Sequence, residues 1–164
     1  MSKNVLVIGT GTIGEPLIGL LAEHRESLGL DKVIFLKRTP LSDERGKVEA
    51  LLRKGAQIVS TSDVLSDFTE LGFSNIYDVE KAYQDADVII DCTPSGNNNW
   101  DNIYSSLDEN KRYLAQGSEH GFGSFFAWGI NNEILENQAN KYLIASCNTH
   151  NIASIVKAFA LDQN

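Results

Sequence analysis

Cysteine is scarce in this sequence: only Cys92 and Cys147 occur among 164 residues, and they form no C-x-x-C pair. This argues against a disulfide framework and a structural zinc site, and since no side chains have metal-ligand spacing we expect no metal. Long apolar runs are missing too. The first apolar run of the sequence, Val5 to Ile8, is too short for a signal peptide or a membrane span. We therefore expect a protein of the reducing cytoplasm that does not contact membranes.

Basic residues are also few, 14 against 22 acidic ones, which gives a formal net charge of −8. A non-specific nucleic-acid binder needs a basic surface, so nucleic acid is not expected as a partner. The charge does not argue against an anionic cofactor, because a local loop can act against the global field. The length and the ordinary hydrophobic content of 42% favour one globular domain over residues 1–164.

Short apolar runs alternate with segments of helical periodicity. We expect strands at residues 4–8, 32–36, 57–60, 87–92, 112–115 and 142–146, and a β-like stretch at 122–128. We expect helices at 13–28, 42–55 with Ser42 as cap, 63–71, 79–84 and 98–107, and a last helix capped by Asn148 or Thr149. This alternation predicts a Rossmann-type α/β fold, a doubly wound, mostly parallel sheet with helices on both faces.

The first strand ends in a glycine loop, Gly9-Thr10-Gly11-Thr12-Ile13-Gly14, which opens the first helix. In this context each glycine has a role: Gly9 permits a tight turn, Gly11 leaves room for a pyrophosphate, and Gly14 lets the helix pack on the strand. The helix N-terminus would present free N–H groups to phosphates. The alternative is a plain strand–helix turn that is rich in glycine.

The end of the second strand bears on the cofactor. NAD sites usually place Asp or Glu there, to accept hydrogen bonds from the ribose 2′-hydroxyl. This strand ends in Lys37-Arg38-Thr39, with no acid. Such residues can hold a 2′-phosphate, so we favour NADP, or use of both cofactors, over NAD alone. The alternative is a solvated basic strand end.

Cys147 lies between an apolar strand and the last helix. The partial charge at a helix N-terminus favours the thiolate, and the carboxyl end of a strand is where α/β sheets bind ligands. A thiol beside a nicotinamide suggests addition to an aldehyde, hydride transfer to NAD(P) and a thioester. From local sequence alone, a buried structural cysteine is an equal alternative. Cys92 ends an apolar strand and is expected in the core. His150 is expected either to face solvent or to act as a capping residue.

Four segments together resemble a known family: residues 9–14 (GTGTIG), 91–96 (DCTPSG), 116–120 (QGSEH) and 146–149 (SCNT). Their order and spacing are similar to those of archaeal-type (class II) phosphorylating glyceraldehyde-3-phosphate dehydrogenases, across essentially the whole chain. The resemblance implies a Rossmann domain that uses NAD and NADP, and a thiohemiacetal at Cys147 followed by a thioester that phosphate attacks. It places the cofactor on Gly9, Gly11, Thr12, Ile13, Gly14, Lys37, Arg38, Thr93, Pro94 and Gly117.

Family members continue beyond the cysteine-bearing helix with a catalytic domain that holds the general base. We therefore expect the chain to be the cofactor-binding domain, truncated soon after Cys147, and His150 should not be taken for the base. The alternatives are a non-catalytic NAD(P)-binding module, a subunit that needs a partner, and a relative of aspartate-semialdehyde dehydrogenase. If active, the substrate would be a phosphorylated aldehyde. An apolar surface made by Phe122, Phe125, Phe126 and Trp128 predicts self-association into a homo-oligomer, with a dimer as the simplest form.

Overall fold

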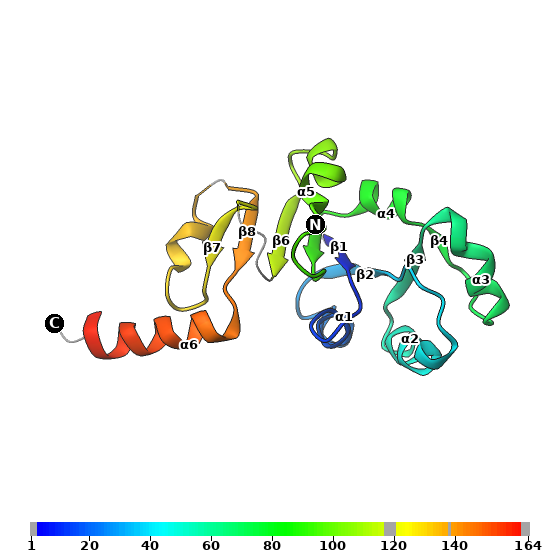
Figure 1. The fold of residues 1–164 in the computed structure, drawn as a ribbon, viewed down its shortest axis with the longest axis horizontal. Coiled ribbons are helices and arrows are strands. Elements are labelled where there is room, and N and C mark those ends of the chain that lie inside the picture. The colour runs from blue at the N-terminus through cyan, green and yellow to red at the C-terminus, as the bar shows by residue number, and fades with distance from the viewer. Residues whose placement is uncertain (1–2, 117–120, 138, 162–164) are drawn as a thin grey trace.

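The computed structural model describes residues 3–116, 121–137 and 139–161. In this part of the chain, eight strands form one parallel sheet in the order β4-β3-β2-β1-β5-β6-β8-β7, shown in Figure 1. The strands are β1 (Lys3–Ile8), β2 (Leu30–Leu36), β3 (Gln57–Ser60), β4 (Tyr77–Asp78), β5 (Val88–Asp91), β6 (Arg112–Gln116), β7 (Ser124–Phe126) and β8 (Lys141–Ile144).

The connections between the strands are mostly helical. The α-helices are α1 (Gly14–Glu23), α2 (Arg45–Arg53), α3 (Leu65–Glu70), α4 (Val79–Asp85), α5 (Asn99–Asn102) and α6 (Cys147–Val156). Short 3₁₀ turns are η1 (Ser42–Glu44), η2 (Ser62–Val64), η3 (Tyr104–Ser106) and η4 (Asn132–Leu135), and a π-helical segment, Lys157–Leu161, continues α6.

The core lies on both faces of the sheet, because successive side chains of a strand point to opposite sides. In β1, Val5 and Val7 pack against α1, α2 and α3, while Leu6 and Ile8 pack against α4 and the α5–η3 segment. All four side chains are almost fully buried, as expected of a strand in a parallel sheet covered on both faces. Figure 1 shows α1 and α2 on one side of the sheet and α4 and α5 on the other.

The predicted fold class is confirmed: this is a doubly wound, Rossmann-type sheet. The strand order reverses at β1, which pairs with β2 on one side and with β5 on the other. Ligands of open α/β sheets bind at such a switch point, beyond the carboxyl ends of the strands. The glycine loop after β1 and the segment after β5 therefore meet at this edge.

Several boundaries differ from the sequence prediction. The helix expected over 13–28 ends at Glu23, and turns over residues 24–29 follow it. Gly29 ends these turns with a φ of +66°, a left-handed conformation that suits glycine. Ser42 does not cap α2 but begins the 3₁₀ turn before it. The expected helix over 98–107 is split into α5 and η3. Strand β4 was not predicted, because two residues are too few for a periodic pattern.

The predicted cap of α6 is also wrong. Ser146, not Asn148 or Thr149, is the N-cap, and its hydroxyl accepts a hydrogen bond from the Thr149 amide at 3.3 Å. Cys147 is therefore the first residue of the helix. No residue of α6 is buried, and in Figure 1 the helix extends away from the sheet.

Four exposed apolar side chains recur along this helix and its π-helical continuation, and we call them the α6 stripe: Ile152, Ile155, Val156 and Phe159. The predicted aromatic surface is only partly present, since Phe125 and Trp128 are exposed whereas Phe122 is a core residue packed on Trp100. No helix in the described part of the chain is long and apolar enough to cross a membrane.

Candidate functional site

The glycine loop lies at the switch point of the sheet. Gly9 has a φ of +95°, and a Cβ there would lie 3.1 Å from the Cys92 carbonyl, so the loop passes close to the segment after β5. A Cβ on Gly14 would overlap the carbonyl oxygen of Gly9, so this position requires glycine for α1 to approach the loop. Both glycines are thus explained by contacts within the chain.

Gly11 differs from its neighbours in the loop. A Cβ at this position would have no atom of the described chain within 4 Å, and its φ is not positive. The amides of Thr12 and Ile13 donate no hydrogen bond to any described residue, and both side chains are exposed. The loop therefore leaves free N–H groups and open space at the start of α1, which are the features of a phosphate site.

A pocket of about 140 Å³ lies next to the glycine loop, at the carboxyl ends of three neighbouring strands. The segments after β1, β2 and β5 all contribute to its lining, which consists of Ile8, Gly9, Thr10, Leu36, Lys37, Arg38, Thr39 and Thr93. The tertiary structure therefore brings together four predicted site residues from distant parts of the sequence: Gly9, Lys37, Arg38 and Thr93.

The side chains of Lys37 and Arg38 point to different partners. Lys37 is buried, and its ammonium forms an ion pair with Glu44 of η1. Arg38 is exposed, and its guanidinium interacts with the buried Tyr83 of α4. Burial raises the pKa of Tyr83 to about 12, against the opposing effect of Arg38, so this tyrosine stays protonated. The sequence prediction counted both cations but no acid, and Glu44 supplies one from the following segment.

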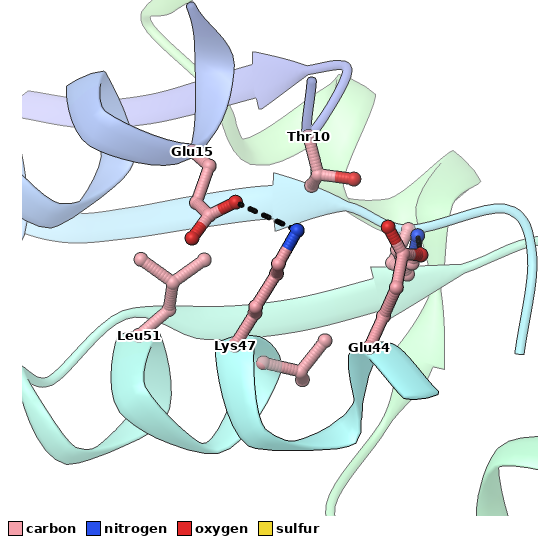
Figure 2. A pocket seen from close by; sticks show the side chains of 7 residues that line it. Thr10, Glu15, Glu44, Lys47 and Leu51 are labelled. Atoms are coloured by element: carbon pink, nitrogen blue, oxygen red, sulfur yellow. Dashed lines mark hydrogen bonds and ion pairs between the residues drawn. The ribbon is translucent and has the colours of Figure 1, made fainter. Parts of the chain in front are cut away.

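Glu44 lines a second, smaller pocket on the other side of Lys37. Figure 2 shows Glu15 of α1 facing Lys47 of α2 across this pocket, with Glu44 at one end. Lys37, the ion-pair partner of Glu44, also lines it. The Glu15 carboxylate lies 3.8 Å from the Lys47 ammonium. The hydrogen bond from Lys37 lowers the pKa of Glu44, the dominant effect over the opposing one of burial, so this carboxyl is charged at neutral pH.

A buried carboxylate organises the segment after β5. Asp91 is 5% exposed; its Oδ1 accepts hydrogen bonds from the amide and hydroxyl of Thr93, at 2.8 and 2.7 Å. Its Oδ2 accepts from the Asn99 amide and the Tyr104 hydroxyl, both at 2.8 Å. These bonds compensate the cost of burying the charge and hold Thr93 next to Gly9.

Sequence reasoning missed Glu44 and the partners of Asp91. The sequence did contain a signal for the partners of Asp91, since a carboxylate that ends a buried apolar strand needs hydrogen-bond donors. Three residues with donor groups follow Asp91 in the sequence: Thr93, Asn99 and Tyr104. No comparable signal marked Glu44, because a 3₁₀ turn in a polar segment has no periodicity.

Cys147 lies at the carboxyl end of β8, on the same edge of the sheet as the glycine loop, and it is exposed. No described residue places a side chain in hydrogen-bonding contact with its thiol. His150 instead contacts the Trp128 carbonyl oxygen at 2.9 Å, and Lys157 donates to the Gly129 carbonyl at 2.7 Å, so both residues tie α6 to the segment after β7.

The other predicted residues have varied positions. Cys92 is buried, as expected, and burial raises the pKa of its thiol to about 11. Pro94 is exposed beyond Thr93. Gly117 lies outside the described residues. Within the described ranges, no group of three or more His, Cys, Asp or Glu side chains has the arrangement of a metal site.

Comparisons with known proteins include a curated relative. Glyceraldehyde-3-phosphate dehydrogenase of Sulfurisphaera tokodaii is 26% identical over 156 residues, which cover 93% of this chain and 42% of that protein. The chain therefore spans less than half the length of this relative. No protein-family model matches the chain.

Among solved structures, D-lactate dehydrogenase from Escherichia coli has a TM-score of 0.48 at 13% identity, over 93% of this chain and 48% of the other. A thermostable alcohol dehydrogenase from Pyrobaculum aerophilum has a TM-score of 0.40 at 18% identity, over 96% and 40%. Similarity at this level concerns the fold alone. The sheet topology is that of a Rossmann-type domain, and the curated relative is a dehydrogenase.

Proposed function

We propose that this chain binds a nicotinamide dinucleotide, NADP or NAD, across the carboxyl ends of β1, β2 and β5. The pyrophosphate would lie on the amides of Gly11, Thr12 and Ile13 at the start of α1, where the helix dipole favours an anion. The adenosine would extend toward Arg38, and Thr93 would line the opposite side. Such a cofactor supplies a hydride acceptor to the reaction.

Gly11 is the observation that carries this proposal. The fold itself requires glycine at positions 9 and 14, but nothing in the described chain approaches the missing Cβ of Gly11. A glycine without a structural reason, followed by two free amides at a helix N-terminus, is explained by a ligand that comes close to the backbone.

The variant Gly11→Ala tests the proposal. Because the added Cβ meets no atom within 4 Å, the fold should keep its melting temperature, while a phosphate can no longer approach the backbone. We expect the affinity for NADP and NAD, measured by calorimetry, to fall about tenfold or more. Gly46→Ala in α2 is the matched control, since it adds the same methyl group in open space away from the loop. Unaltered affinity in Gly11→Ala, or no binding by the unmodified chain, would reject the proposal.

We further propose that this domain belongs to an aldehyde-oxidising enzyme of the phosphorylating, class II glyceraldehyde-3-phosphate dehydrogenase type. The curated relative and the four sequence segments support this. Cys147, exposed at the first position of α6, would be the nucleophile: its sulfur bonds to the aldehyde carbon, and the proton that the thiol loses ends on the carbonyl oxygen. The substrate would be a phosphorylated aldehyde.

The unburied α6 favours one alternative, a subunit or domain that needs further protein surface to act, because a helix with no buried residue is normally covered. An assay of NADP reduction with glyceraldehyde 3-phosphate and phosphate separates the cases. Turnover that Cys147→Ser abolishes supports the enzyme. Cofactor binding without turnover would instead support the partner-dependent subunit or a non-catalytic binding module. Turnover with aspartate semialdehyde in its place would support the related semialdehyde dehydrogenases.

A further inference from the structure

Lys37 lies between the two pockets beside the glycine loop and lines both of them. Its backbone is held in place: its amide donates to the Val59 carbonyl at 3.0 Å, and its carbonyl accepts from the buried Ser60 hydroxyl at 2.6 Å. Only the Lys37 side chain can therefore turn from one pocket to the other.

In the structure the Lys37 side chain is turned toward the smaller pocket, where its ammonium forms an ion pair with the Glu44 carboxylate. Glu44 is labelled in Figure 2. The pair is well shielded from water, with side-chain exposures of 9% for Lys37 and 27% for Glu44. The other pair of the pocket, Glu15 with Lys47, is open to solvent at 36% and 60%. An ion pair at low exposure is stronger than one in water, so Glu44 is the main competitor for the Lys37 charge.

We propose that Glu44 sets the preference between the two dinucleotides, an inference that rests on the proposed cofactor function. A 2′-phosphate would be stabilised by the Lys37 ammonium, but Glu44 holds that ammonium, and the Glu44 carboxylate itself repels the phosphate. A 2′-hydroxyl is a donor and meets no such repulsion. Arg38 remains exposed toward the first pocket, so NADP still binds, but with less advantage than a strand end of Lys37-Arg38-Thr39 suggests.

Glu44→Gln keeps the side-chain size and removes the negative charge. We expect the affinity for NADP relative to that for NAD to rise about tenfold, the effect of freeing one close charge. Adding Lys37→Met to this variant should reduce the gain to the part that comes from relief of the Glu44 repulsion, since the freed ammonium is the other cause. Glu15→Gln is the matched control: it removes one charge from the same pocket but leaves Lys37 paired, so the ratio should change by less than about twofold.

Calorimetric titrations of each variant with both dinucleotides decide the matter, and Glu44→Ala repeats the test if the glutamine variant does not fold. The inference is supported if the affinity for NADP relative to NAD rises in the Glu44 variants and not in Glu15→Gln. If the unmodified chain binds but the Glu44 variants keep its ratio, or Glu15→Gln shifts it equally, Glu44 is not the determinant. If the unmodified chain binds neither dinucleotide, the proposed function itself fails.

Discussion

The buried carboxylate of Asp91 should be the most sensitive polar position in this fold. Replacement by asparagine keeps one oxygen for the two donors of Thr93, but it puts an amide group where Oδ2 accepts from Asn99 and Tyr104. The Tyr104 hydroxyl can rotate and accept a hydrogen bond from the new amide nitrogen at position 91. The Asn99 amide cannot accept through its nitrogen, so two N–H donors then face each other. The variant therefore loses a charge-assisted hydrogen bond and leaves one buried N–H of Asn99 unsatisfied, while the Asn99 amide still donates to the Thr93 hydroxyl at 3.1 Å.

The magnitude follows from these contacts. A hydrogen bond to a charged group contributes about 1.5–3 kcal/mol, and a buried unsatisfied donor costs about 1–3 kcal/mol. Asp91 is only 5% exposed, so water cannot compensate. We expect Asp91→Asn to lower the free energy of unfolding by about 3–5 kcal/mol, and Tm by on the order of 10 °C in a domain of this size.

Urea unfolding followed by circular dichroism measures the change. Asp101→Asn is the matched control, because Asp101 is an exposed residue on the same short helix as Asn99 and should leave the midpoint unchanged. Tyr104→Phe removes a single donor and should give a smaller loss than Asp91→Asn. A loss below about 1 kcal/mol in Asp91→Asn, at an unchanged denaturant slope, would refute the account of this network.

Three further results are expected. In the folded chain at neutral pH, iodoacetamide should modify the exposed Cys147 and spare Cys92, whose pKa burial raises to about 11; peptide mass spectrometry checks this, and equal labelling would contradict the packing. The Asn4 amide, with Lys3, lowers the pKa of Asp87 from 3.8, so its stabilisation is complete above that pH and is lost as pH falls through the lower folded value; Asp87→Asn should reduce acid sensitivity below about pH 4, and an unaltered acid transition would count against it. The α6 stripe should cause self-association of two copies that Phe159→Glu weakens, as sedimentation velocity would show; a monomer at every concentration of the unmodified chain would disprove it.

Much of the fold could be predicted from local patterns. The apolar runs that became β1, β2 and β5 are buried on both faces, and a run of that kind is legible in any sequence window. Predictions failed where a boundary depends on one contact. The cap of α6 is Ser146 because its hydroxyl reaches the Thr149 amide, and neighbouring residues of the same type were equally plausible by sequence.

The candidate site divides in the same way. The glycine loop and its place after a strand could be read from the sequence alone, since a positive φ at Gly9 and the approach of the Gly9 carbonyl at Gly14 restrict these two positions to glycine by local sterics. Which charges meet at the candidate site depends on the tertiary packing. Glu44 neutralises Lys37, and four donors surround Asp91, because electrostatic partners are chosen by distance in space and by exclusion of water, neither of which a linear sequence encodes.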